Sequence, residues 1–284
     1  MWEPPDYAVP ESFVEHEVAG TLTLPVASGP RPGVVLLAGG GPVDRDETSG
    51  PNKPLKDLAW GLASRGVAVV RFDKRSGGVT MAEEYVPDSV AAVRLVATES
   101  DRVFLVGHSM GGKAAPRVAA SEPPVAGLVI LAGDTQPMHE AAVRVARHLR
   151  SIGAVPAELV DAITRQAAAV SQLTPSAPAE DLLFGFPASY WLDLRDYDPV
   201  ATAAAVDRPI LILQGGRDYQ VTVADDLARW RAGLADRDDV TIRVHEAADH
   251  LFFPGTQPST PAQYAERQHV DAAVIDDIAS WIQR

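Results

Sequence analysis

Short apolar or alternating runs, separated by segments of helical periodicity, recur along most of the chain. Such runs of about four to eight residues predict strands. Eight are present, at residues 13–18, 21–24, 34–37, 67–72, 103–106, 128–131, 210–213 and 240–244. Helical periodicity covers residues 55–64, 89–97, 113–120 and 268–282. Strands that alternate with helices predict a parallel sheet with helices on both faces, opened here by an antiparallel hairpin that turns at Ala19-Gly20.

One long segment breaks this alternation. Between Thr135 and Val200 no strand pattern is present, and residues 138–151 and 156–173 have helical periodicity instead. An insertion of this length is too long for a simple connection between two strands. We therefore predict a helical lid over the active-site end of the sheet. The lid covers residues 136–200, and the core consists of residues 1–135 and 201–284.

Aromatic residues near the end of this lid are candidates for the wall of a substrate pocket. They are Phe184, Phe186, Tyr190 and Trp191. The alternative is that these rings only pack the lid onto the core, because large apolar side chains are buried in most settings. Both interpretations stay open for each ring.

Composition restricts the class of protein. The chain has 284 residues, of which 46% are hydrophobic and 22% charged, as in ordinary globular proteins. A net charge of -13 disfavours nucleic acids and anionic membrane surfaces as partners. The absence of cysteine excludes thiol catalysis, disulfides and zinc–thiolate sites. No apolar run reaches the roughly 18 residues of a membrane span, and the first residues do not have the pattern of a signal peptide, so we expect a cytoplasmic location.

The most informative motif is Gly-His-Ser-Met-Gly at residues 107–111, between an apolar run and a small-residue segment. This order predicts a strand, a sharp turn and a helix, with Ser109 at the apex. The strained backbone of such a turn leaves no room for side chains at the flanking glycines. The free amide of Met110 is then placed to donate to an oxyanion. His108 occupies the variable position of the motif and is expected to pack beside the nucleophile, as a member of the substrate pocket.

Two further segments accompany this motif. Residues 39–47 read Gly-Gly-Gly-Pro-Val-Asp-Arg-Asp-Glu, and residues 213–221 read Leu-Gln-Gly-Gly-Arg-Asp-Tyr-Gln-Val. With the serine motif they resemble α/β-hydrolases over nearly the full length, and within that superfamily the single-domain bacterial esterases of the prolyl-oligopeptidase-like or dienelactone-hydrolase-like group. Gly40 stands where serine is common in that group. The resemblance implies the α/β-hydrolase fold, a mostly parallel eight-stranded sheet with helices on both faces and a helical lid insertion.

The resemblance also implies partners for the serine. A serine hydroxyl needs a base, which is usually a histidine that a buried carboxylate orients. In α/β-hydrolases the acid and then the histidine follow the serine along the chain. Asp218 follows the apolar run at residues 210–213, and His250 lies in a loop past the next run, so both match this order. Asp134, which also follows a strand, is a minor alternative for the acid, and His245 is interpreted as a strand-surface residue.

An oxyanion hole requires a second donor besides the Met110 amide. The resemblance favours the backbone amide of Gly40, with Gly41 as the alternative, because glycine allows close approach to the substrate. The charged segment at residues 44–46 is expected to pin this loop, against Lys74-Arg75, and not to bind a metal.

These inferences predict a serine esterase that cleaves a small-molecule carboxylic ester through an acyl-enzyme, with no cofactor and no metal. We expect a monomer or homodimer and an apolar pocket for short or medium acyl chains. The same triad serves thioesters and lactones, so a thioesterase or lactonase is an alternative. A non-hydrolytic lyase or cyclase, or a ligand-binding module, is an alternative of another class.

Overall fold

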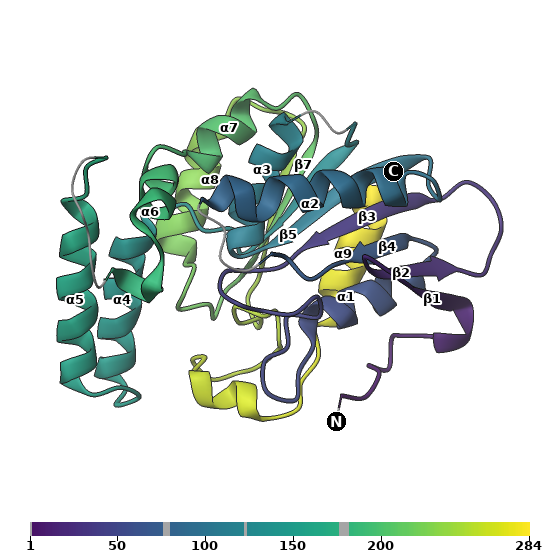
Figure 1. The fold of residues 1–284 in the computed structure, drawn as a ribbon. Coiled ribbons are helices and arrows are strands. Elements are labelled where there is room, and N and C mark those ends of the chain that lie inside the picture. The colour runs from purple at the N-terminus through teal and green to yellow at the C-terminus, as the bar shows by residue number, and fades with distance from the viewer. Residues whose placement is uncertain (1, 76–79, 122–123, 176–181) are drawn as a thin grey trace.

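A computed structural model describes residues 2–75, 80–121, 124–175 and 182–284. Within these ranges the centre is an eight-stranded sheet in the order β1-β2-β4-β3-β5-β6-β7-β8 (Figure 1). The strands are β1 Phe13–Val18, β2 Gly20–Pro25, β3 Pro32–Leu37, β4 Ala68–Arg71, β5 Arg102–His108, β6 Gly127–Leu131, β7 Ile210–Gly215 and β8 Val240–His245. Strand β2 is antiparallel to β1 and β4, and all other neighbours are parallel. The predicted fold class is therefore confirmed.

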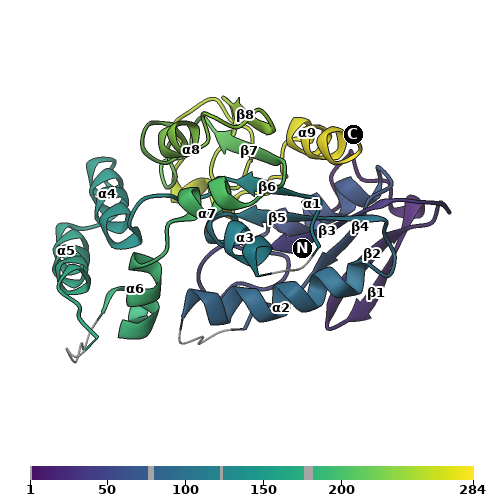
Figure 2. The same cartoon turned by 90° about the horizontal axis from the view of Figure 1, so that it is seen from above.

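Helices cover both faces of the sheet (Figure 2). One face carries α1 Pro54–Ala63 and α9 Ala272–Ile282; the other carries α2 Met81–Val96, α3 Met110–Ala120, α7 Pro199–Ala205 and α8 Ala228–Gly233. Successive side chains of a strand point to opposite faces. Val34 and Leu36 of β3 accordingly lie in one hydrophobic core, and Val35 and Leu37 lie in the other. Burial on both faces explains why this strand is apolar throughout.

Some helices differ from the prediction. Helix α2 begins at Met81, well before the expected start at residue 89. The side chain of Thr80 caps it by accepting from the Glu83 amide, and Pro87, which ordinarily interrupts a helix, lies inside it. Helices α6, α7 and α8 were not predicted, because their eight, seven and six residues are too few to display helical periodicity. No helix in the described ranges is long and apolar enough to cross a bilayer.

The insertion after β6 stands beside the sheet (Figure 1). It contains α4 Met138–Ser151, α5 Ala157–Ser171 and α6 Ala188–Arg195, and α4 has the bounds that the sequence predicts. A third hydrophobic cluster joins Val170 and Leu173 of the insertion to Tyr85 of α2 and Met110 of α3. Helix α7 instead buries Val200 in the core beneath α2 and α3. The insertion beside the sheet therefore ends before α7, slightly earlier than the predicted boundary at residue 200.

Candidate active site

Ser109 occupies the turn between β5 and α3. Its backbone has φ 51° and ψ -119°, a combination that costs energy in a residue with a side chain. A Cβ at Gly107 would lie 2.2 Å from the carbonyl oxygen of Gly111, and a Cβ at Gly111 would lie 2.3 Å from that of Leu37. Only glycine fits on either side of the turn, for the steric reason that the sequence motif suggests.

The structure brings Ser109, His250 and Asp218 together. His250 Nε2 lies 3.2 Å from Ser109 Oγ, and His250 Nδ1 lies 2.7 Å from Asp218 Oδ2. Because a carboxylate only accepts, Nδ1 carries the proton, and Nε2 is left to accept one from the serine hydroxyl. The three residues follow β5, β8 and β7, at the carboxyl edge of the parallel strands, where α/β proteins bind their ligands.

Asp218 is held firmly. Its side chain is fully buried, with 0% exposure. Oδ1 accepts the backbone amides of Gln220 at 2.8 Å and Val221 at 3.0 Å, and Gln214 Nε2 lies 3.3 Å from Oδ2. A carboxylate fixed in this way can orient the His250 ring and stabilise its protonated form.

The two alternative residues engage other groups. Asp134 Oδ2 accepts from Lys113 Nζ at 2.6 Å, an ion pair between the loop after β6 and α3. His245 Nε2 lies 3.1 Å from Asp277 Oδ2 on α9. Asp218 is thus the carboxylate that faces the His250 ring.

The predicted oxyanion donors, the amides of Gly40 and Met110, belong to neighbouring residues. A Cβ at Gly40 would lie 3.4 Å from Met110 Cε. Met110 is the first residue of α3, where a helix offers its N–H no acceptor. The loop is fixed at Gly39, whose amide donates to Glu47 Oε1 at 3.1 Å and whose carbonyl accepts from the Tyr85 hydroxyl at 2.9 Å.

The ring of His108 lies beside that of His250, with ring centroids 4.8 Å apart. Its Nδ1 lies 2.8 Å from Glu47 Oε1, and its Nε2 lies 2.8 Å from the backbone carbonyl oxygen of His250. A carboxylate and a carbonyl both accept, so both ring nitrogens donate and the ring is an imidazolium. Burial lowers the pKa of His108, but the charge and hydrogen bond of Glu47 outweigh burial, and the net pKa is raised.

The charged segment at residues 44–46 pins its loop, but through partners other than those predicted. Asp46 Oδ1 accepts from Arg71 Nε at 2.7 Å. Arg45 Nη2 donates to Asp73 Oδ2 at 2.6 Å. The expected partners, Lys74-Arg75, pair with two carboxylates of α2. The physical reason is position: Arg71 ends β4, the strand next to β3, and so lies directly beside the loop that follows β3.

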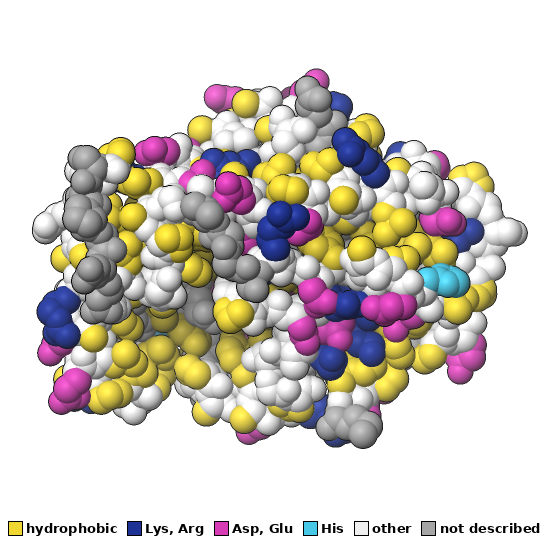
Figure 3. Space-filling model, viewed as in Figure 1, with side chains coloured by type: hydrophobic (Ala, Val, Ile, Leu, Met, Phe, Trp, Pro, Cys, Tyr) yellow, Lys and Arg dark blue, Asp and Glu magenta, His cyan; other side chains and the backbone are white. Residues whose placement is uncertain are grey.

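A cavity of about 650 Å³ opens at Ser109 and His250. Helix α4 contributes Met138, Ala141, Ala142 and Val145 to the cavity wall. The other apolar residues that line the cavity are Pro42, Val43, Met110, Phe184, Phe186, Val221 and Leu251. In Figure 3 apolar side chains gather at the lower left, in the region of the insertion. The volume and the lining suit a small, largely apolar ligand.

Of the predicted pocket residues, His108, Phe184 and Phe186 border this cavity, whereas Tyr190 and Trp191 do not. Tyr190 is 1% exposed, and its hydroxyl donates to a carboxylate oxygen of Glu84 on α2. Trp191 is 2% exposed and borders a different cavity. Both rings belong to the cluster that joins the insertion to α2 and α3, so for them the packing interpretation holds.

Three residues that the sequence analysis did not single out support the site: Glu47, Tyr85 and Gln214. Two of them lie in the segments that carry the family resemblance, at residues 39–47 and 213–221. Their partners could not be read from these segments, because Glu47 reaches His108 across 61 positions and Tyr85 reaches Gly39 across 46.

Comparison with known proteins identifies the class. A model of the alpha/beta hydrolase family matches residues 34–267, and the chain therefore belongs to that family. Esterase EstD from Thermotoga maritima is 37% identical over 296 residues, which cover 99% of this chain and 70% of that protein. The family resemblance stated from the sequence is thereby confirmed.

Solved structures agree on the fold. The esterase domain of a Rhodothermus marinus protein matches with a TM-score of 0.58 at 20% identity, covering 93% of this chain and 92% of that one. An esterase from Pyrococcus furiosus matches with a TM-score of 0.56 at 15% identity, covering 100% of this chain and 97% of that one. At these identities the likeness shows the fold alone.

Proposed function

We propose that the protein is a carboxylesterase that forms an acyl-enzyme on Ser109. One observation carries the proposal: a line of hydrogen bonds runs from Asp218 through His250 to Ser109 Oγ, at the apex of a strained turn that borders a cavity. The similarity to a relative named an esterase supports it independently. The acid, base and nucleophile follow the order found in α/β-hydrolases.

The geometry suits two successive acyl transfers. His250 Nε2 takes the Ser109 proton as Oγ attacks the ester carbonyl, and it gives that proton to the departing alcohol. A water that His250 deprotonates then attacks the acyl-enzyme, and the proton returns to Ser109 Oγ as the carboxylic acid leaves. Asp218 keeps the proton of His250 on Nδ1 and stabilises the imidazolium. The amides of Met110 and Gly40 stabilise both oxyanions, and loss of one such donor typically costs about 3 kcal/mol.

The cavity supports a proposal for the substrate class. Its volume of about 650 Å³ and its apolar wall favour small-molecule esters with short or medium acyl chains. The lid of this proposal is the segment from residue 136 to the start of α7, because α4 forms part of that wall and α7 belongs to the core. A cytoplasmic monomer or homodimer stays the prediction of the sequence.

The test is hydrolysis of p-nitrophenyl esters with about two to about twelve acyl carbons, a span that covers typical pocket sizes. Ser109→Ala is expected to lower kcat by about 10⁶-fold, as in other serine hydrolases. Ser121→Ala, at the end of the same helix, is the matched control and should keep full activity. Equal turnover by the wild type and Ser109→Ala would contradict the proposed nucleophile. A folded wild type that hydrolyses none of the esters would contradict a carboxylesterase with this pocket.

A further inference from the structure

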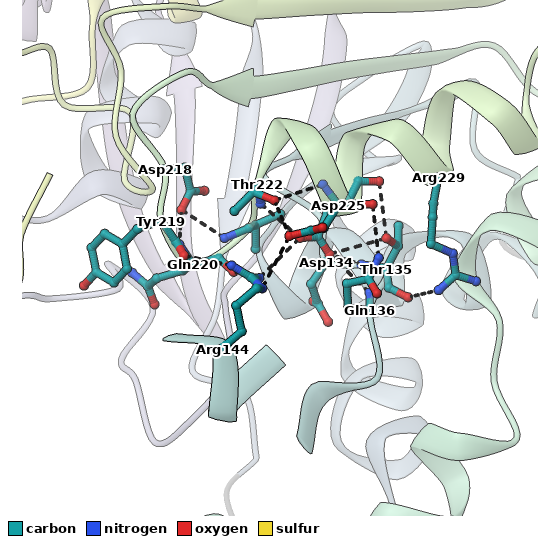
Figure 4. A network of polar contacts seen from close by, with 12 residues as sticks. Asp134, Thr135, Gln136, Arg144, Asp218, Tyr219, Gln220, Thr222, Asp225 and Arg229 are labelled. Carbon is teal, nitrogen blue, oxygen red and sulfur yellow. Dashed lines mark hydrogen bonds and ion pairs between the residues drawn. The ribbon is translucent and has the colours of Figure 1, made fainter. Parts of the chain in front are cut away.

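An arginine of the insertion contacts the loop that holds the proposed catalytic acid. Arg144, on α4, donates through Nη1 to the carbonyl oxygen of Tyr219 at 3.1 Å and through Nη2 to that of Gln220 at 2.8 Å (Figure 4). Both acceptors lie in the loop between β7 and α8, directly after Asp218. Arg144 itself does not line the cavity at Ser109. Through these two hydrogen bonds, Arg144 can affect the position of the loop that holds Asp218 without contacting the substrate.

The same two peptide groups hold Asp218. The carbonyl of Tyr219 and the amide of Gln220 form one planar peptide group, and the carbonyl of Gln220 and the amide of Val221 form the next. Asp218 Oδ1 accepts from these two amides, at 2.8 Å and 3.0 Å. One guanidinium thus binds the carbonyl side of both groups, and one carboxylate binds the amide side. A cation at the carbonyl oxygens polarises each group and strengthens its N–H as a donor.

Carboxylates of the core hold the guanidinium in place. Arg144 Nε lies 3.5 Å from Asp225 Oδ2, and Nη2 lies 3.7 Å from Asp226 Oδ2. Asp226 also accepts the amides of Thr135 and Gln136, at 2.9 Å and 3.1 Å, where the chain enters the insertion. The start of the insertion and its first helix are therefore anchored to the same acidic segment (Figure 4).

A second residue of α4 contacts the same loop. The ring of His148, one turn after Arg144, stacks on Tyr219 with centroids 5.2 Å apart and an interplanar angle of 20°. The neighbouring residues Ala141, Ala142 and Val145 line the cavity. One helix thus contacts both the space for the substrate and the loop of the acid.

We propose that Arg144 is a positioning residue for the catalytic acid, through which the docking of α4 fixes the two peptide groups that hold Asp218. The inference rests on the proposed function, since it assigns Arg144 a role in a reaction that uses Asp218. With α4 docked, the carboxylate is fixed against His250 Nδ1. When the two hydrogen bonds of Arg144 are absent, these peptide groups lose their restraint and Asp218 orients His250 less well.

The test is a double-mutant cycle between Arg144→Ala and Asp218→Asn, measured as kcat and KM for p-nitrophenyl acetate. Arg144→Ala should lower kcat about tenfold, the effect of losing hydrogen bonds from a charged donor, with little change in KM. Arg144→Lys should recover part of kcat, because an ammonium can donate to one of the carbonyls. Arg147→Ala removes an exposed arginine of the same helix and should leave kcat unchanged.

The decisive result is the effect of Arg144→Ala in the Asp218→Asn background, where an amide replaces the oriented carboxylate. If Arg144 acts through Asp218, its loss there causes no further fall in kcat. The same tenfold fall in both backgrounds, or no fall in either, would overturn the inference. If Asp218→Asn itself leaves kcat unchanged, the proposed triad fails instead. The low activities of the Asp218→Asn variants are corrected for the rate that Ser109→Ala shows under the same conditions.

Discussion

Two buried histidine–carboxylate pairs lie side by side in this protein, Asp218 with His250 and Glu47 with His108. Their Nδ1–oxygen distances are 2.7 Å and 2.8 Å, and the two rings are 4.8 Å apart. They differ at the other ring nitrogen. His250 Nε2 faces the Ser109 hydroxyl, which can give up a proton, whereas His108 Nε2 faces a backbone carbonyl, which can only accept.

This difference separates a ring that can accept a proton from the serine from a ring that only donates hydrogen bonds. His250 can take a proton and return it, so its pair is suited to catalysis. His108 already donates through both nitrogens and has no site for a further proton. Its pair instead ties Gly39 of the oxyanion loop, through Glu47, to the backbone of His250. Both pairs contain a carboxylate at Nδ1, so the group that faces Nε2 determines whether the histidine can transfer a proton.

The largest expected effect comes from making the same change in each pair. Asp218→Asn should lower kcat by about 10⁴-fold, because the amide no longer fixes the reactive tautomer of His250. Glu47→Gln should cost about tenfold, since it weakens hydrogen bonds that only position the site. Both variants are compared by ester hydrolysis. Equal losses would remove the distinction between a catalytic and a positioning pair.

A smaller effect tests whether the position of the loop at Gly39, which the second pair also holds, matters for catalysis. Tyr85→Phe removes the hydroxyl that donates to the carbonyls of Ala38 and Gly39, at 3.0 Å and 2.9 Å. We expect a severalfold fall in kcat, with a loss of about 1–3 kcal/mol in the free energy of unfolding from the unpaired carbonyls. Tyr197→Phe, which removes a bond to the Lys113 carbonyl, is the control. If both variants lower kcat equally, the effect is one of general stability.

The smallest effect concerns pH and the stability of the fold. Burial lowers and Glu47 raises the pKa of His108, with a raised pKa as the net result. A raised folded-state pKa stabilises the fold fully below the unfolded value of about 6.5. That stabilisation is lost as the pH rises through the folded-state pKa, by about 1.4 kcal/mol for each unit of elevation. The stability difference between the wild type and His108→Gln should therefore shrink with rising pH.

Chemical denaturation at a series of pH values, from below about 6.5 upward, measures the difference in unfolding free energy between the wild type and His108→Gln. His16→Gln, at an exposed position, is the matched control and should show no such trend. A difference between the wild type and His108→Gln that is constant with pH would show that His108 keeps the same charge in the folded and unfolded chain.

Features that are local in the sequence could be predicted. The central strands, such as β3, are buried on both faces and so appear as short apolar runs. The turn at Ser109 requires glycine at positions 107 and 111, and these requirements lie within five residues. Asp218 and His250 were predicted from the chain order of α/β-hydrolases, and each follows a recognisable strand. The start of α2 was missed because Pro87 lies inside that helix.

Features that depend on how distant segments dock could not be predicted. Glu47 meets His108 only because the loop after β3 folds across the end of β5. Arg144 meets its two carbonyls only when α4 lies against the loop after β7. The ring of Tyr190 differs little in character from that of Phe186, yet the former is buried against α2 and the latter borders the cavity. A helix as short as α6 has too few residues for its hydrophobic periodicity to indicate which side faces the core.

The central claim is that Ser109 is the nucleophile and carries the acyl group of the acyl-enzyme. The most direct measurement is trapping with a serine-reactive phosphonate, followed by mass spectrometry of the peptides. We predict one adduct, on Ser109, that forms more slowly in Asp218→Asn and is absent from Ser109→Ala. An adduct on another residue, or an enzyme that keeps hydrolysing esters without any adduct, would contradict it.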